Sequence, residues 1–137
     1  MNSERKLATI LATDCVNFSK HMEENEELTL TNLNECRKII DDVIAEFGGK
    51  IFSTAGDSVV AEFPSPVQCV KAAIEFQDKL YERNEHSLTK LKLSWRVGIH
   101  VDDVIVENNN IMGSGVNVAA RLESQSEPGK ILVSKIV

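Results

Sequence analysis

The chain has 137 residues, of which 42% are hydrophobic and 26% are charged, and its formal net charge is −6 at pH 7. This length and composition fit one globular domain with its own core, which we expect to span residues 1–137. An acidic surface is repelled by nucleic acid and by anionic membranes, so neither is expected as the main partner.

The N-terminus and the cysteines predict the compartment of the protein. The first apolar segment is too short for a signal-peptide core or a membrane span, so we expect a cytoplasmic protein. Cys15, Cys36 and Cys69 are odd in number and far apart. This pattern favours reduced, buried thiols over a disulfide framework or a zinc site.

The first elements follow from the spacing of apolar residues. An apolar strand is predicted over residues 7–13, and Asp14 begins a short helix. A longer helix is predicted over residues 26–47, because apolar side chains recur there at helical spacing. Gly48 and Gly49 end this helix, since glycine is the usual residue in a left-handed C-terminal cap.

Residues 50–63 are predicted to form a β-hairpin with Asp57 at its tip. Runs of β-branched and aromatic residues flank a short Thr-Ala-Gly-Asp connection, and Gly56 supplies the positive φ that so tight a reversal requires. If the second hairpin strand pairs antiparallel with the first strand of the chain, Asp14 and Asp57 meet at one rim of the sheet. Two carboxylates this close repel each other, and a divalent cation between them removes the repulsion. The pair therefore predicts a magnesium site.

The second half of the chain completes an α+β pattern. It is predicted to contain a helix over 64–82, strands over 91–100 and 101–107, a turn at 108–110, a helix within 113–123 and a strand over 131–133. The order β-α-α-β-β-α-β-β-α-β favours a ferredoxin-like α/β sandwich, in which a mostly antiparallel sheet carries the helices on one face. The chain stops just after the last strand without a terminating signal, so we expect the domain to be incomplete at its C-terminus.

Four stretches together carry a family resemblance that covers nearly the whole chain. They are Ile10-Leu-Ala-Thr-Asp-Cys-Val-Asn-Phe-Ser, Gly48-Gly-Lys-Ile-Phe-Ser-Thr-Ala-Gly-Asp-Ser-Val-Val-Ala-Glu-Phe, Arg96-Val-Gly-Ile-His and Gly115-Val-Asn-Val-Ala-Ala-Arg-Leu-Glu. In this order they resemble the catalytic domain of class III adenylate and guanylate cyclases. Four motifs in register are far more specific than any one of them.

The resemblance implies a nucleotide site with two metal ions. Asp14 and Asp57 are implied to bind two Mg²⁺ ions, or Mn²⁺ in their place, and the Cys15 carbonyl is implied as a further ligand. The backbone of Val16, Asn17 and Phe18 is implied to hold the triphosphate of ATP or GTP. One metal ion would make the 3′-hydroxyl of the nucleotide more acidic, so that it attacks its own α-phosphate and forms a 3′,5′-cyclic nucleotide and pyrophosphate.

Two further residues are implied to act from the opposite subunit of a homodimer. Asn117 is similar to the residue that orients the ribose, and Arg121 to the one that neutralises charge at the α-phosphate. Their i, i+4 spacing places both on one helix face, which equally suits a solvated surface. The expected dimer is symmetric, and its interface uses the hairpin and the sheet face without helices. A single chain would then be inactive.

The residues implied to contact the base depart from both common patterns. ATP-selective members usually carry Lys and Asp where this chain has Ser53 and Asn110, and GTP-selective members usually carry Glu and a small residue. Serine and asparagine both donate and accept hydrogen bonds, so neither purine is excluded and base discrimination is expected to be weak. ATP is preferred only because it is the commoner substrate in the family.

Other classes of protein remain as alternatives. A nucleotide-binding or dimerising regulatory domain without turnover is favoured by Ser53, Asn110 and the absence of the C-terminal strands that carry the family's transition-state lysine. A diguanylate cyclase would show Gly-Gly-Asp/Glu-Glu-Phe where Ala55-Gly-Asp-Ser-Val stands. A palm-type polymerase is disfavoured by the acidic surface.

Overall fold

A computed structural model describes residues 3–86, 91–108 and 110–135. The elements are β1 (Ser3–Cys15), α1 (Phe18–Glu24), α2 (Glu26–Glu46), β2 (Lys50–Ala55), β3 (Ser58–Phe63), α3 (Pro66–Glu85), β4 (Trp95–Glu107), β5 (Asn110–Met112), α4 (Ser114–Gln125) and β6 (Ile131–Val133). The order of helices and strands is the predicted one as far as α3, although Asp14 belongs to β1 and the short helix begins only at Phe18. Beyond α3, one strand, β4, replaces two predicted strands, and β5 stands where a turn was expected.

The strands form a mostly antiparallel sheet, which confirms the predicted α+β class. The strand order is β2-β3-β1-β4-β5, and β6 pairs with β4 beside this path. β1 lies antiparallel to both β3 and β4, and β6 runs parallel to β4. The first strand of the chain is thus central, and the second hairpin strand is its neighbour, as the sequence predicted.

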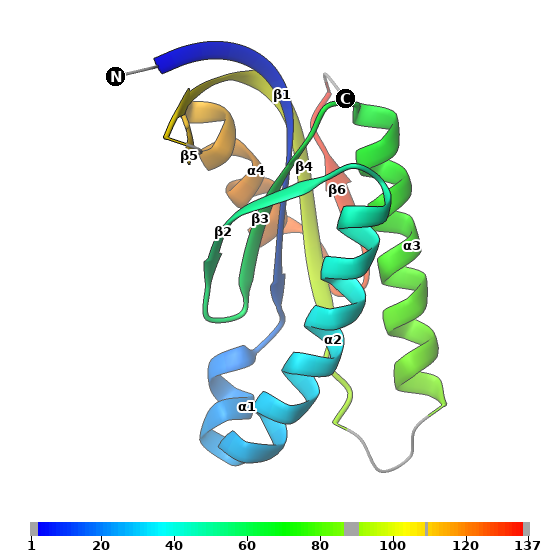
Figure 1. Cartoon of the computed structure of the whole chain (residues 1–137). Helices are drawn as coiled ribbons and strands as arrows, with labels where there is room; N and C mark the ends of the chain where they lie inside the picture. The colour runs from blue at the N-terminus through cyan, green and yellow to red at the C-terminus, as the bar shows by residue number, and fades with distance from the viewer. Residues whose placement is uncertain (1–2, 87–90, 109, 136–137) are drawn as a thin grey trace.

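Helices cover both faces of the sheet (Figure 1). The long helices α2 and α3 pack on one face, against residues such as Leu11 and Ile99. α4 packs on the other face, where Ala119 lies in a smaller cluster with Ile10 and Val104. The expectation that helices occupy one face therefore holds for the long helices and is corrected for α4. The physical reason is that alternate residues of β1 are apolar on both sides, so both faces need a cover.

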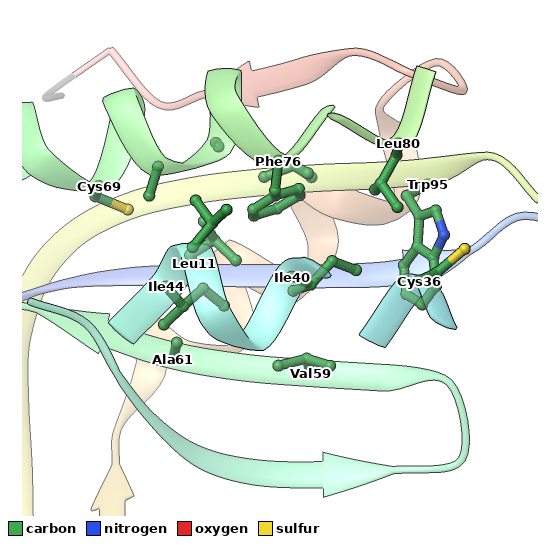
Figure 2. Packing of buried hydrophobic residues seen from close by; sticks show 14 of the residues in the cluster. Leu11, Cys36, Ile40, Ile44, Val59, Ala61, Cys69, Phe76, Leu80 and Trp95 are labelled. Carbon is green, nitrogen blue, oxygen red and sulfur yellow. The ribbon is translucent and has the colours of Figure 1, made fainter. Parts of the chain in front are cut away.

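The main core lies between the sheet and the pair α2–α3 (Figure 2). Ile40 and Ile44 come from α2, Phe76 comes from α3, and Trp95 comes from the start of β4. All four are at most 1% exposed. Burial of each such side chain contributes roughly 1.5–3 kcal/mol to folding, so this cluster holds the helices in place on the sheet. Cys15, Cys36 and Cys69 lie in buried positions, as predicted.

The predicted strands over 91–100 and 101–107 are one continuous strand, β4. It runs from Trp95 to Glu107 because β1 pairs with it along its whole length, from Cys15 opposite Trp95 to Ser3 opposite Glu107. The next strand is β5, so Asn110 lies in a strand instead of a turn. Residue 109 of the predicted turn lies outside the described residues. Among the described helices, none has both the length and the apolar character needed to cross a bilayer.

Candidate active site

The tip of the β2–β3 hairpin meets the end of β1. Antiparallel pairing places Thr13 opposite Val59, so the two-residue reversal at Gly56 and Asp57 lies beside the last residues of β1. The Oδ2 atom of Asp57 accepts a hydrogen bond from the backbone N–H of Cys15 at 2.9 Å. The tertiary structure therefore brings Asp57 next to the segment that carries Asp14, although 42 positions separate Cys15 and Asp57.

The two carboxylates are close enough to influence each other. Burial raises the pKa of Asp57 most, and the negative charge of Asp14 raises it further. Hydrogen bonds from the backbone N–H groups of Cys15 and of Asp57 itself lower this pKa. Asp57 is thus held in a fixed orientation by a backbone donor while it is repelled by Asp14, which is the electrostatic situation that a cation relieves.

Arg96 forms an ion pair with the carboxylate of Asp14. The sequence did not predict this contact. Asp14 and Arg96 are opposite each other in the β1–β4 ladder. Arg96 donates from Nε to Oδ1 at 3.1 Å and from Nη2 to Oδ2 at 3.0 Å, which is the two-bond pairing typical of arginine and carboxylate. Only the strand register could have found this pair, because the residues lie 82 positions apart.

Glu123 is a second site residue that the sequence did not indicate. It lies on α4, its side chain is 8% exposed, and its Oε2 atom is 3.9 Å from Nη2 of Arg96. Burial is the main cause that raises the pKa of Glu123 to about 8, and a hydrogen bond with Asp14 and the charge of Asp14 add to the effect. Arg96 also donates from Nη1 to the Ser124 carbonyl at 3.1 Å, so it connects Asp14 to α4.

The segment between β1 and α1 changes direction at Asn17. Asn17 has φ 56 and ψ 33, a left-handed conformation that asparagine tolerates better than most residues. Val16 donates its N–H to the Ser94 carbonyl at 2.8 Å, so this donor is already used within the chain. The first-turn N–H groups of α1, which begins at Phe18, have no partner inside the helix.

The remaining predicted residues lie away from the two carboxylates. Ser53 is exposed on the outer strand β2, and Asn110 is exposed in β5. Asn117 and Arg121 are exposed on α4, opposite the buried Ala119 and Glu123. In the part of the chain that the structure describes, none of these predicted residues forms a hydrogen bond or ion pair with Asp14 or Asp57.

The oxygen atoms near the rim suit a metal ion that is also bound by the phosphates of a substrate. Within the described residues, no group of three or more His, Cys, Asp or Glu side chains is arranged to hold a metal. Mg²⁺ is usually bound by one or two carboxylates together with substrate phosphates and water. The carboxylates of Asp14 and Asp57 and the carbonyl of Cys15 are oxygen donors of the kind that such a site uses.

Comparison with known proteins identifies the family. The family model for the adenylate and guanylate cyclase catalytic domain matches residues 2–137. A Rhizobium meliloti protein provisionally named adenylate cyclase 3 is 35% identical over 131 residues, which is 95% of this chain and 22% of that protein. An adenylate cyclase of Streptomyces coelicolor is 30% identical over 131 residues, or 95% of this chain and 32% of that protein. The chain thus spans about a fifth to a third of the length of these relatives.

Solved structures share the fold over nearly the whole of this chain. An adenylate/guanylate cyclase/hydrolase from Silicibacter pomeroyi is 41% identical with a TM-score of 0.90, over 98% of this chain and 79% of that one. The guanylyl cyclase Cya2 is 28% identical with a TM-score of 0.89, over 99% and 78%. The fold is therefore that of a nucleotide cyclase catalytic domain. The chain belongs to the class III adenylate and guanylate cyclase family.

Proposed function

We propose that this domain converts ATP or GTP to the 3′,5′-cyclic nucleotide and pyrophosphate as a homodimer. The observation that carries the proposal is the meeting of Asp57 with the Asp14–Cys15 segment, in a chain of the cyclase family. ATP is the first candidate substrate because it is the commoner one in the family. Ser53 and Asn110 are proposed to contact the base, where their neutral groups suit either purine.

The chain's own residues orient the reacting groups. Asp14, Asp57 and the Cys15 carbonyl are proposed to hold two Mg²⁺ or Mn²⁺ ions, which would neutralise the triphosphate and acidify the ribose 3′-hydroxyl. The Cys15 N–H donates a hydrogen bond to Asp57 and so holds this carboxylate at the rim of the sheet. The backbone at Val16, Asn17 and Phe18 is proposed to lie along the phosphates.

A symmetric dimer explains the placement of the remaining residues. Asn117 and Arg121 point outward from α4, so a second copy can receive them at its own Asp14 and Asp57. α4 contacts β1 and β4, which removes these strands from the sheet face first expected at the interface. We therefore propose that the interface combines the outer side of α4 with the β2–β3 hairpin.

One observation favours a second candidate function. The bidentate pair between Arg96 and Asp14 leaves the proposed metal carboxylate neutralised without a metal. Together with Ser53 and Asn110, this suits a domain that binds nucleotide or dimerises for regulation and does not turn over.

Turnover measurements on the full-length protein that contains this domain separate the two functions. ATP and GTP are each supplied with Mg²⁺ or Mn²⁺, and cyclic nucleotide and pyrophosphate are quantified. Asp57→Asn is expected to lower turnover by roughly a hundredfold or more, because it removes a charge from the site that stabilises the transition state. Asp42→Asn, on the exposed surface of α2, is the matched control and should not change the rate.

The outcome decides between the candidates. Absence of cyclic product from the unmutated protein with both nucleotides would contradict the cyclase proposal. Calorimetric binding of nucleotide without release of pyrophosphate would then support the regulatory module.

A further inference from the structure

The contact between Arg96 and Asp14 is built into the fold. The residues face each other across the β1–β4 ladder, and the guanidinium group forms two bonds to Asp14 and one to the Ser124 carbonyl. Their side chains are 27% and 20% exposed, respectively. Three directed hydrogen bonds in a partly buried place fix this arginine more firmly than a surface ion pair.

Both oxygens of Asp14 are used by this arginine. A metal ion that binds Asp14 must approach one of these oxygens, and the guanidinium group carries positive charge at the same position. Two cations at one carboxylate repel each other, so the arginine and a metal ion compete.

The negative charges around Asp14 explain why this carboxylate has a cationic partner. Nη2 of Arg96 lies 3.0 Å from Oδ2 of Asp14 and 3.9 Å from Oε2 of Glu123, and Asp57 is bound to the N–H of the residue after Asp14. The region therefore gathers three carboxyl groups around one guanidinium group. Without that group, the negative charges would repel one another.

We propose that Arg96 is an internal cation that holds the Asp14 carboxylate in the nucleotide-free protein and must be displaced before a metal ion binds there. The inference rests on the proposed function, because it takes Asp14 as a metal ligand. Arg96 is a positioning residue in this state, since it acts through Asp14. The consequence is a low affinity for metal ions alone, which limits occupation of the site before nucleotide arrives.

Direct measurement of Mn²⁺ binding to the nucleotide-free, full-length protein tests the proposal. Free Mn²⁺ is followed by electron paramagnetic resonance, and the heat of binding by calorimetry. Arg96→Gln is expected to bind Mn²⁺ about tenfold more tightly or better, because a hydrogen-bonded charged competitor is removed. An equal or lower affinity in folded Arg96→Gln would overturn the proposal.

Arg37→Gln is a matched control. Arg37 pairs with Asp41 through the same two-bond geometry, at 3.2 and 3.1 Å, on the outer part of α2. Its removal is expected to leave Mn²⁺ affinity unchanged. An equal gain in Arg37→Gln would show a non-specific charge effect and would also overturn the proposal.

Two further variants assign the site and guard against misfolding. Arg96→Lys keeps the charge but cannot form the fork, so a smaller gain in Mn²⁺ affinity is expected, and this variant decides the matter if Arg96→Gln does not fold. Adding Asp14→Asn to Arg96→Gln should abolish the gain. If the gain persists in the double variant, Mn²⁺ does not use Asp14 and the inference fails. Failure of the proposed function itself gives a different result. In that case Asp14→Asn alone does not change Mn²⁺ binding to the protein when nucleotide is present.

Discussion

Glu123 is a buried carboxyl group whose charge state depends on the fold. Its side chain lies between α4 and the Asp14–Arg96 pair, and burial raises its pKa to about 8. A carboxyl group with a raised pKa binds its proton more tightly in the folded protein than in the unfolded chain. Its contribution to stability is complete below the unfolded pKa near 4.5 and is lost as the pH rises through about 8.

We predict that the metal-free protein loses stability between pH 5 and pH 9, and that Glu123→Gln removes much of this loss. The expected difference between the two proteins is on the order of 2 kcal/mol across this range, because the neutral amide does not ionise. Urea denaturation at several pH values with a chelator measures it. Glu127→Gln, which alters an exposed residue, is the control. Parallel curves for Glu123→Gln and the unmutated protein would contradict the prediction.

At the scale of elements, the backbone of α4 packs directly against Gly98 of β4. A Cβ atom at Gly98 would lie 2.3 Å from the backbone nitrogen of Glu123 and 2.5 Å from the carbonyl oxygen of Ala119. Both of these are backbone atoms of α4, so a side chain at position 98 can be accommodated only if the helix moves. The position of α4 in turn decides where Asn117 and Arg121 point.

Gly98→Ala is expected to lower the free energy of unfolding by about 3 kcal/mol, because the methyl group overpacks the β4–α4 contact. Ala120→Ser changes an exposed residue of the same helix and should stay within about 0.5 kcal/mol of the unmutated protein. Urea denaturation of both variants makes the comparison. A Gly98→Ala variant as stable as Ala120→Ser would show that α4 tolerates a shift away from β4.

For the whole molecule, the proposed site residues fall into two separate groups. Asp14 and Asp57 lie at the rim where β1 meets the hairpin, whereas Asn117 and Arg121 lie exposed on α4. One chain is therefore proposed to supply the first group to one site and the second group to the other site of a dimer.

Mixed dimers test this division. Asp57→Asn and Arg121→Ala are each expected to be inactive as homodimers, and a one-to-one mixture should recover about a quarter of the unmutated activity. Half of the dimers are then mixed, and each mixed dimer has one complete site of two. Cyclic nucleotide production by coexpressed chains is the measurement. Pairing Asp57→Asn with a chain that carries both substitutions should recover nothing. If mixed dimers of the first pair form but the mixture is inactive, Arg121 acts at the site of its own chain and the proposed division is wrong.

The sequence by itself determined the order of elements from β1 to α3 and the place of the hairpin. The end of α2 just before Gly48, the reversal at Gly56 and the pairing of β1 with β3 follow from local turn chemistry and from apolar periodicity. These same signals predicted that Asp57 lies near Asp14. The helix end and the hairpin turn depend on residues that are close in the chain. The pairing of β1 with β3 follows from the order of the strands.

Only the tertiary structure decided which charges surround Asp14. The pair with Arg96, the burial of Glu123 and the placement of α4 on the second face depend on strand register and close packing. The unbroken length of β4 likewise depends on its partner β1. Periodicity describes which face of an element is apolar, but it does not describe which polar side chain meets which across 82 positions of chain. That choice is made when the elements pack, because packing alone sets the distances between them.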